Sequence, residues 1–433
     1  MSDANANPGT SPSSGMRDFL PLEAAHRRRV LNAIVSSYRR DGFSEIGTPC
    51  MERLEVLQNA QGGENDKLTY KVLKRGDKLS AALQAHPMRE LADAGLRFDL
   101  TVPLSRFVGH HSAELPLPFK AIQVGPVWRA ERPQKGRFRE FIQCDIDILG
   151  EASSHAEIEL ILATAKCLSE LGVDGTQIRI NDRRIITQFA RYCGFADSFF
   201  ETFFIALDKL DKIGLDGVVR EFQASGAQPQ AIHKFQSFLG AKAGASSTLR
   251  ELQAEFGPAT DAACDDVDEI IRGVEKASAG RVAITFDLTL VRGMGYYTGP
   301  IFEAVHPQYA SSLGGGGRYD GMIGRFSGRS IPACGFSIGF ERLLDLIAQR
   351  GQMDPGPERC ALLYDAGDDF IQALRAAEHL RSNGREILLV RRKKNFREQV
   401  SMLNKIGVHR ALKLADTTHP DLAFFDIGPD ARV

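Results

Sequence analysis

Residues 128–150 read WRAERPQKGRFREFIQCDIDILG, and this stretch carries the strongest evidence for the fold. Residues 119–127 before it and 140–149 within it both have the composition of strands, and a basic turn at 132–139 separates them. Two strand-like runs joined by a short polar turn are typical of an antiparallel hairpin. The sequence therefore predicts a hairpin whose turn is rich in arginine.

Side chains alternate in character along the second strand of this hairpin. Gln143, Asp145 and Asp147 are polar, whereas the residues between them are apolar. Successive side chains of a strand point to opposite faces, so the three polar residues should share one face. Carboxylates on an inner strand need a partner that offsets their loss of water. A substrate ammonium group is one such partner.

The turn of the hairpin is strongly basic. Its cations within eleven positions are Arg129, Arg132, Lys135, Arg137 and Arg139. Guanidinium groups match phosphate oxygens in pairs, so this turn can hold a polyphosphate or the end of an RNA. A solvated basic turn on an ordinary hairpin is the alternative.

A second polar segment, FDLTVPLSRF, occupies residues 98–107. It should begin extended and become helical after Pro103, with Asp99 and Thr101 on one strand face ahead of that proline. Taken alone, the segment is weak evidence for a binding site, and a cap at the end of a strand is the simpler interpretation.

A third segment, TFDLTLVRGMGYYTG at residues 285–299, ends in a glycine-flanked turn. A strand delivers Arg292 to this turn, and Tyr296 and Tyr297 follow it. Glycines let a backbone approach a ligand closely. The tyrosines could wall a planar, polar substrate, or they could be core residues beside a tight turn.

A fourth segment spans residues 312–343 and contains the glycine run 314–317, which suggests close packing against a ligand. A small-residue strand around 333–336 follows, and then a helix at 339–349. Arg342 lies near the start of that helix, where the helix dipole disfavours a cation unless an anion is bound. This conflict with local preference points to function.

Composition limits the class of protein. The 433 residues fit two or three domains, and no apolar run approaches the roughly 20 residues needed to span a bilayer. The net charge of −1 disfavours a dedicated non-specific nucleic-acid binder but permits local basic patches. Seven scattered cysteines without a C-x-x-C pair predict neither zinc nor a disulfide framework, and they fit a cytoplasmic protein.

Together and in this order, these segments resemble the class II aminoacyl-tRNA synthetases, and specifically the histidyl-tRNA synthetase family. GFSEIGTP at 42–49 resembles motif 1 of the class, residues 128–150 resemble motif 2, and residues 335–343 resemble motif 3. LVRGMGYYTG at 290–299 is similar to the histidine-specific signature, although Gly295 stands where that signature usually has Asp.

The resemblance implies an α+β catalytic domain, with a class II synthetase-type antiparallel sheet flanked by helices, a helical insertion and a small C-terminal α/β domain. The expected divisions are a disordered tail at 1–14, the catalytic domain at 15–180 and 281–350, the insertion at 181–280, a linker at 351–358, and a shortened anticodon-binding-like domain at 359–433. In that last domain the final strand and helix are expected to be missing or degenerate after Asp416, and the basic run 391–394 either faces RNA or is a solvated helix start.

The family's roles in ATP binding carry over to matching positions. The resemblance implies that Arg129 holds the α-phosphate of ATP, that Glu131 contacts the adenine side, and that Arg137 and Arg342 hold the β- and γ-phosphates with Mg²⁺ bridging them. Arg292 would be an additional cation at the α-phosphate. Arg129, Arg292 and Arg342 are accordingly the expected catalytic residues, and no side chain is expected to hold a metal ion.

The family's amino-acid site carries over in the same way. The residues expected to bind histidine are Asp99, Thr101, Gln143, Asp147, Arg292, Tyr296 and Tyr297, with the two tyrosines lining the imidazole pocket. Gln134 in the basic turn would approach the tRNA acceptor end. The implied partners are L-histidine, ATP, tRNA(His) and a second copy of the chain, with no membrane.

The implied reaction agrees with the residues. A histidine carboxylate attacks the α-phosphorus in line, and histidyl-adenylate then passes its acyl group to the tRNA. Positioning and positive charge suffice for the first step, so no protein nucleophile is required. Two alternatives stay open: a non-catalytic, synthetase-like regulatory subunit of ATP phosphoribosyltransferase, and a synthetase paralogue with a non-standard acceptor.

Overall fold

The computed structural model describes residues 9–59, 68–85, 91–133, 137–241, 248–293, 295–351, 356, 358–418 and 422–429. Residues 1–8 of the expected tail, and Gln134, lie outside the described residues. The chain divides into two compact units, which are described separately below: Met1–Arg17 with Ala33–Arg350, and Asp18–Asn32 with Gly351–Val433. The finer domain boundaries given above stay predictions.

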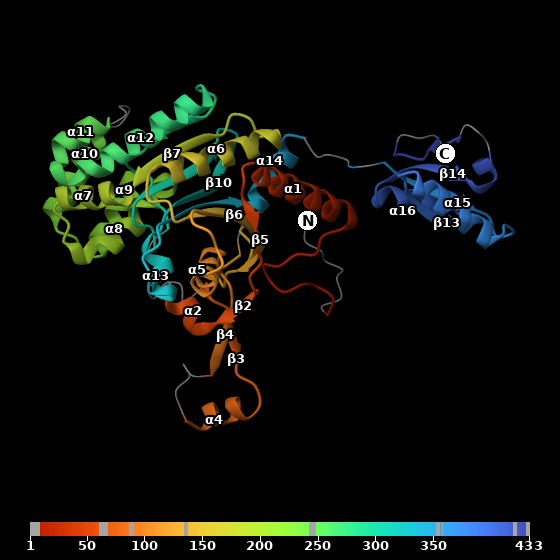
Figure 1. Ribbon diagram of the computed structural model, residues 1–433, viewed down its shortest axis with the longest axis horizontal. Helices are drawn as coiled ribbons and strands as arrows, with labels where there is room; N and C mark the ends of the chain where they lie inside the picture. Colours follow the sequence, from red (N-terminus) through yellow and green to blue (C-terminus); the bar gives the residue numbers. More distant parts are fainter. Residues whose placement is uncertain are drawn as a thin grey trace. The chain divides into compact units, whose positions relative to one another are not determined.

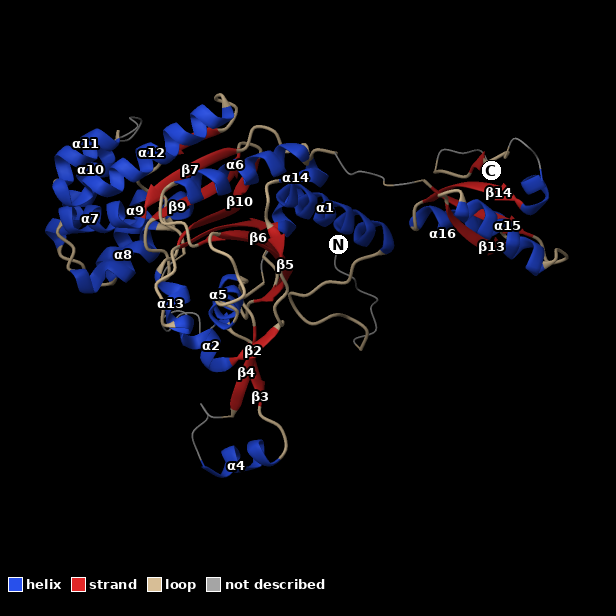
Figure 2. Ribbon diagram, in the orientation of Figure 1, coloured by secondary structure: helices blue, strands red, loops and turns tan. Residues whose placement is uncertain are grey.

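The first unit is built on a mixed, mostly antiparallel sheet, which has eight strands in the described residues (Figures 1 and 2). Across the sheet the strands are β1 (Ser44–Glu45), β5 (Phe119–Trp128), β6 (Glu140–Leu149), β11 (Ala333–Gly339), β10 (Tyr309–Arg318), β9 (Pro300–His306), β7 (Gln177–Asp182) and β8 (Ala283–Phe286). Only β1 with β5 and β7 with β8 pair in parallel within it. The predicted hairpin is confirmed, since β5 and β6 pair antiparallel over their whole lengths.

The predicted alternation along β6 is also confirmed. Cys144, Ile146 and Ile148 are buried on one face of the sheet. Helices α1 (Pro21–Arg40) and α6 (His155–Glu170) cover this face. Burial raises the pKa of Tyr38 in α1, and so do the nearby Cys167 of α6 and Cys144 of β6. This apolar face fixes the register of the hairpin, because a slip by one residue would turn the polar side chains of β6 toward the apolar face instead.

The other face of the sheet carries α5 (Thr101–His110) and α13 (Gly321–Ser327). The expectation that the helix starts after Pro103 is wrong, since α5 begins two residues earlier. Proline is tolerated in the first turn of a helix, where its missing N–H has no intrahelical partner. Thr101 is therefore the first residue of a helix, and it does not share a strand face with Asp99.

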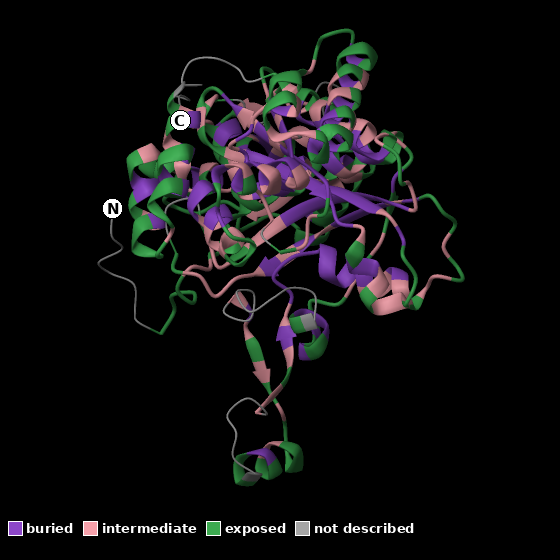
Figure 3. Ribbon diagram, turned by 90° about the vertical axis from the view of Figure 1, so that its left-hand side faces the viewer, coloured by how far each residue is buried: buried purple, intermediate pink, exposed green. Residues whose placement is uncertain are grey.

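A smaller three-stranded sheet extends from this unit in the order β2 (Met51–Arg53), β4 (Ala92–Leu96) and β3 (Lys71–Leu73). It is accompanied by α2 (Leu54–Asn59) and by the largely exposed α4 (Asp77–Ala85) (Figure 3). The strand expected at residues 43–49 is only the short β1. Ile46 donates one further N–H to the carbonyl of Ile122, and the ladder ends before Pro49, which has no N–H.

Helices fill the stretch between β7 and β8, where the sequence composition shifts. They are α7 (Arg183–Cys193), α8 (Phe200–Leu207), α9 (Leu210–Ala224), α10 (Pro229–Ala241), α11 (Leu249–Phe256) and α12 (Asp261–Ser278). Phenylalanines form much of their core; the rings of Phe203 and Phe222, for example, are stacked with centroids 5.4 Å apart. Helix α12 packs on α6 and β7, which joins this region to the large sheet.

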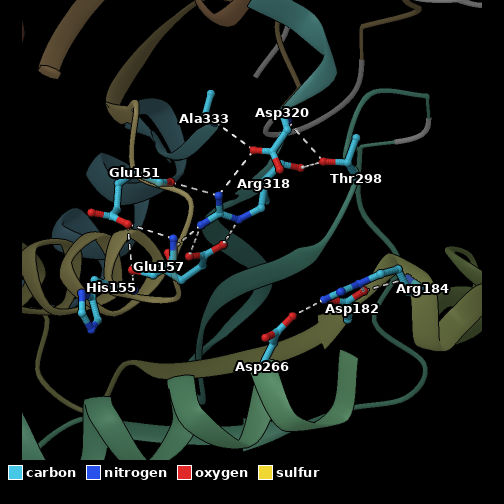
Figure 4. Close-up of polar contacts among 11 residues, drawn as sticks. Glu151, His155, Glu157, Asp182, Arg184, Asp266, Thr298, Arg318, Asp320 and Ala333 are labelled. Carbon is cyan, nitrogen blue, oxygen red and sulfur yellow. Dashed lines mark hydrogen bonds and ion pairs between the residues drawn. The ribbon is translucent and has the colours of Figure 1, made fainter. Parts of the chain in front are cut away.

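A buried ion pair ties α6 to the end of β10 (Figure 4). The guanidinium of Arg318 donates to both carboxylate oxygens of Glu157, at 2.6 and 2.7 Å, and the Glu157 side chain is fully buried. Arg318 also donates to the carbonyls of Glu151 and Ser153, and to the carboxylate of Asp320. One side chain therefore holds the start of α6 and the end of β10 together.

The second unit contains a four-stranded sheet in the order β13 (Glu386–Arg391), β12 (Arg359–Tyr364), β14 (Val408–Lys413) and β15 (Phe425–Asp426). Helices α15 (Phe370–Ser382) and α16 (Phe396–Lys405) connect its parallel strands, as the sequence predicts for an α/β domain. After Asp416 the described residues contain one short strand: β15 has two residues and pairs antiparallel with β14. Among the described residues of the whole chain, no helix is both long and apolar enough to cross a membrane.

Candidate active site

The polar face of β6 is where the predicted site residues meet. Gln143 donates from Nε2 to Ser337 Oγ at 2.9 Å and lies 3.3 Å from Asp145 Oδ2. The hydroxyl of Tyr319 donates to Asp147 Oδ1 at 2.6 Å. Gly335 stands beside Asp147, and a Cβ built on it would lie 2.0 Å from Oδ1, so only glycine leaves room for this carboxylate.

Arg129 connects this face with the segment before α5. Its Nε donates to the carbonyl of Phe98 at 3.0 Å, and its Nη2 approaches Gln143 Oε1 at 3.4 Å. Next to Phe98, Asp99 accepts the N–H of Val102 at 3.1 Å and so caps the start of α5. The interpretation of Asp99 as a cap at the end of a strand is wrong, because its carboxylate accepts an N–H in the first turn of a helix. Arg129 is close enough to Asp99 to oppose the rise in pKa that burial causes.

Three carboxyl groups are buried in this region, and burial raises the pKa of each. The pKa of Asp147 is raised to about 7, against the opposing effect of the Tyr319 hydroxyl, and that of Asp99 to about 6, against the Val102 N–H and Arg129. Burial together with the nearby charge of Asp147 raises the pKa of Asp145 well above its usual value. A positively charged ligand on this face would offset the cost of ionising these groups.

The pKa of Asp147 leads to a prediction about stability. An unfolded aspartate has a pKa of about 4. The folded protein therefore binds a proton more tightly, and the free energy of unfolding should fall as pH rises from about 4 to about 7. Asp147→Asn removes this contribution, so its free energy of unfolding should fall less steeply over the same interval. Chemical denaturation across these pH values measures both slopes; equal slopes would show that Asp147 has an ordinary pKa.

A second group of residues is cationic. Arg292 donates from Nη2 to Ser312 Oγ at 2.6 Å and forms an ion pair with Glu303. Arg342, in the first turn of α14 (Phe340–Gln349), donates from Nη1 to the carbonyl of Ser312 at 3.0 Å. Ser312 thus joins two of the predicted catalytic arginines.

Electrostatics place four arginines in one neighbourhood. Burial lowers the pKa of Arg342, and so do the charges of Arg292, Arg137 and Arg129. In the described part of the chain, Arg342 has no ion-pair partner, although it is half-buried and lies at a helix N-terminus. Such an arrangement favours a bound anion with several charges.

The basic turn is partly described. Arg137 pairs with Glu131 at 3.0 Å, and Arg139 donates to the carbonyl of Glu131 at 2.9 Å. Arg137 and Glu131 lie on either side of the undescribed residues 134–136, so the structure does not place Gln134.

Tyr296 and Tyr297 lie side by side, with ring centroids 4.5 Å apart and hydroxyl oxygens 3.4 Å apart. Burial raises the pKa of Tyr297 to about 12 and that of Tyr296 well above its usual value. Asp145 also raises both, which places the tyrosines near the polar face of β6. Gly295 has a φ of +109°, a conformation that other residues rarely adopt, so its backbone accounts for glycine at this position.

The glycine run forms the end of β10, where it packs against the protein's own side chains. A Cβ on Gly315 would lie 2.5 Å from the guanidinium carbon of Arg292, and one on Gly317 would lie 3.1 Å from the ring of Tyr297. The expectation of close packing is confirmed, but the groups that pack against the run belong to the protein itself and include Arg292 and Tyr297. These glycines serve the site indirectly, by leaving space for two of its side chains.

Several residues of the site were not predicted as part of it. They are Gln123, Glu303, Ser312, Ser337 and Tyr319, which contact or face the predicted residues. Gln123 and Glu303 gave one usable signal, since each is a polar residue within a mostly apolar inner strand. The two serines gave none. No group of three or more histidine, cysteine or carboxylate side chains suited to a metal ion occurs among the described residues.

Comparisons with known proteins agree with this geometry. The sequence profile of the family described as Histidyl-tRNA synthetase matches residues 15–343. The histidine–tRNA ligase of Leifsonia xyli subsp. xyli is 46% identical over 430 residues, which cover 97% of this chain and 98% of the relative. The chain is therefore not short in comparison with that relative.

Solved structures share the fold. The histidyl-tRNA synthetase from Nostoc sp. PCC 7120 superposes with a TM-score of 0.76 at 25% identity, covering 98% of this chain and 95% of the other. An ATP phosphoribosyltransferase regulatory subunit/histidyl-tRNA synthetase from Bacillus halodurans superposes with a TM-score of 0.72 at 20% identity, covering 91% and 96%. The second likeness concerns the fold alone. With the matching profile and the 46% identical ligase, the chain belongs to the histidyl-tRNA synthetase family.

Proposed function

We propose that the protein ligates L-histidine to tRNA at the expense of ATP, through a histidyl-adenylate intermediate. The observation that carries this proposal is the position of Arg129. It lies within the electrostatic reach of Arg342 on one side, and it contacts Gln143 beside the buried carboxyl groups on the other. A site for anions, formed by the arginines, therefore lies beside a site for cations, formed by the carboxyl groups. An enzyme that joins an amino acid to a nucleoside triphosphate needs both.

The arginines would act on the phosphates. Arg129 and Arg292 would hold the α-phosphate, where negative charge grows as the carboxylate attacks and pyrophosphate leaves. Arg137 and Arg342 would hold the β- and γ-phosphates, and Glu131 would contact the adenine side. Fixed cations in a half-buried site stabilise such charge with little reorganisation during the reaction. The side chains need only bind and orient the reactants.

The polar face of β6 would bind histidine. The ammonium group would be bound by Asp99, Thr101, Gln143 and Asp147, and the ionised carboxylates would offset its charge. Tyr296 and Tyr297 would line the imidazole pocket. Arg292 would contact the histidine substrate as well as the α-phosphate. Gln134 is proposed to approach the tRNA acceptor end.

Further parts of the proposal concern cofactors and assembly. Mg²⁺ is bound mainly by phosphates and waters in sites of this kind, and its ligands from the protein are oxygens. Glu131 and Glu303, paired with Arg137 and Arg292, are oxygen donors that fit this need. The residues at 42–49, which resemble motif 1, support a homodimer. The chain would act in the cytoplasm.

The relatives separate the two alternatives. Regulatory subunits share the fold, so the fold does not distinguish them, but the 46% identity is to a histidine–tRNA ligase. All four arginines expected at the phosphates are also present. A non-standard acceptor is supported only by the short β15 at the C-terminus, and the length match to a ligase argues against it.

Two assays test the proposal. Purified protein should catalyse histidine-dependent exchange between ATP and pyrophosphate, and an inactive protein that binds histidine would support a regulatory role instead. It should also charge transcribed tRNA(His). If the protein catalysed exchange but did not charge tRNA(His), it would still form the adenylate, and its acceptor would be a different molecule.

The second unit is proposed to bind the anticodon region through its exposed basic run at 391–394. Arg392 forms an ion pair with Asp365, and Lys393 is exposed. The double variant Arg392→Ala, Lys393→Ala should weaken tRNA affinity by about tenfold and leave exchange unchanged, because each lost phosphate contact weakens binding at low salt. Filter binding measures the affinity. Arg272→Ala, at an exposed arginine of α12, is the control, and unchanged affinity in the double variant would favour a solvated helix start.

A further inference from the structure

Gln123 is a buried side chain of β5 that satisfies only half of its amide group. It is 2% exposed, and its Nε2 donates to the carbonyl of Leu100 at 3.2 Å. This bond fixes the orientation of the amide, because the opposite orientation would place Oε1 against the carbonyl oxygen. In the part of the chain that the structure describes, buried Oε1 has no hydrogen-bond partner. More than nine in ten buried polar groups have one.

The pairing of β5 with β6 identifies the neighbour of this amide. Gln123 lies directly opposite Asp145, so the two side chains share the polar face with Cβ atoms about 5 Å apart. Asp145 is 3% exposed. Gln143 lies 3.3 Å from its Oδ2, and the hydroxyl of Ser337 also bonds to it. An ionised Asp145 could only accept hydrogen bonds, whereas a protonated one could also donate to Gln123.

The charges around Asp145 favour its neutral form. Asp145 interacts electrostatically with several ionisable groups. They include the carboxyls of Asp99 and Asp147, the phenols of Tyr296 and Tyr297, and the guanidinium of Arg97. The guanidinium of Arg97 donates to the carbonyls of Pro126 and Thr48, so it is not hydrogen-bonded to Asp145. If Asp99, Asp145 and Asp147 were all ionised, with no cation hydrogen-bonded to Asp145, the three buried carboxylates would repel each other strongly.

We propose that Gln123 is a positioning residue, which accepts a hydrogen bond from a protonated Asp145 and so keeps that side chain neutral. This inference rests on the proposed roles of Asp99 and Asp147 in binding the histidine ammonium. When Asp145 is neutral, only Asp99 and Asp147 remain to bind a substrate with one ammonium charge. The proton of Asp145 is donated in a hydrogen bond to Oε1 of Gln123. Gln123 also holds Leu100, the residue between Asp99 and Thr101, in place.

Infrared difference spectroscopy tests the proton directly. The spectrum of the wild-type protein minus that of Asp145→Asn, near neutral pH and without substrate, should show the carbonyl band of a protonated carboxyl group. Gln123→Met removes the acceptor, so this band should weaken or shift in that background. A carboxylate band in place of the carboxylic acid band would overturn the proposal and make a substrate N–H the partner of Gln123.

Exchange kinetics provide the second test. Gln123→Met should raise the KM for histidine by about tenfold and leave the KM for ATP within about twofold, the scale of one lost hydrogen bond in a binding site. Gln399→Met, which removes another buried glutamine in the second unit, is the matched control for general loss of stability. Equal effects of the two variants on both KM values would contradict a role for Gln123 in positioning.

Comparison of two asparagine variants separates this inference from the proposed function. Asp145→Asn mimics the neutral acid, whereas Asp147→Asn loses a charge. The fold-increase in the KM for histidine should therefore be at least about ten times smaller in Asp145→Asn than in Asp147→Asn. A rise in Asp145→Asn as large as that in Asp147→Asn would refute the neutral Asp145. If Asp147→Asn instead had no effect, the proposed role of Asp147 would fail, and the infrared result would still decide the state of Asp145.

Discussion

Arg292→Ala is expected to reduce histidine-dependent ATP–pyrophosphate exchange by at least about 100-fold while leaving the fold intact. Arg292 lies within the electrostatic reach of Arg342, and both contact Ser312. Its loss would remove positive charge from the α-phosphate at the point where negative charge develops. It would also leave Glu303 with only its longer ion pair to Arg179, at 3.5 Å. Exchange rates at saturating histidine and ATP measure the effect, and circular dichroism checks the fold.

Two variants control this experiment. Arg272→Ala removes an exposed arginine that pairs with Asp268 on α12, and it should leave the exchange rate near that of the wild type. Arg292→Ala combined with Glu303→Gln also removes the negative charge of the carboxylate that pairs with Arg292. If the double variant recovered most of the activity, the role of Arg292 would be to neutralise Glu303, and near-normal exchange in folded Arg292→Ala would remove it from the mechanism.

The central hairpin could be predicted because its signal is local. Strand alternation repeats every two residues, so the segment at 140–149 shows which side chains share a face without reference to the rest of the chain. The structure confirms this for Gln143 and Asp147, which lie on the polar face opposite the buried Cys144. Arg342 was identified in a similar way, since a cation in the first turn of a helix conflicts with a local rule.

The partners of these residues could not be predicted, because sheet pairing and loops bring them together from distant positions. Ser337 reaches Gln143 from the neighbouring strand β11, and Ser312 reaches Arg292 and Arg342 from β10. A single serine has no pattern that marks it as a neighbour of an arginine. The start of α5 was misplaced for a different reason: proline was taken as the end of a strand, although the first turn of a helix also accepts it.

The glycine run shows how a correct pattern can point to the wrong partner. Glycine marks a position where something approaches the backbone closely, but it does not say whether that is a ligand or a side chain. In β10 the nearest group to Gly315 is the guanidinium of Arg292, and the groups close to Gly317 include the carbonyl of Pro300 and the ring of Tyr297. The sequence predicted the close approach, and only the fold could identify what approaches.

The largest expected effect on stability comes from the other face of the same strand. Arg318 follows Gly317 and points away from the site, toward the fully buried Glu157 of α6 (Figure 4). Glu157→Ala would leave the Arg318 guanidinium buried without its main counter-charge. Removing one partner of a buried pair typically costs about 3–5 kcal/mol, so chemical denaturation should show a loss of that size.

Helix α6 itself supplies the matched control. Glu159, two residues further along, pairs with Lys120, and its side chain is 39% exposed. Glu159→Ala should cost at most about 1 kcal/mol, because water solvates an exposed lysine that loses its partner. Similar losses in the two variants would show that the Arg318–Glu157 pair owes little to burial. Because Arg318 and the site residue Tyr319 are consecutive and point to opposite faces, Glu157→Ala should lower stability far more than it raises the KM for histidine in protein that remains folded. A rise in that KM of more than about tenfold would instead make the pair a positioning element for the Tyr319–Asp147 hydrogen bond.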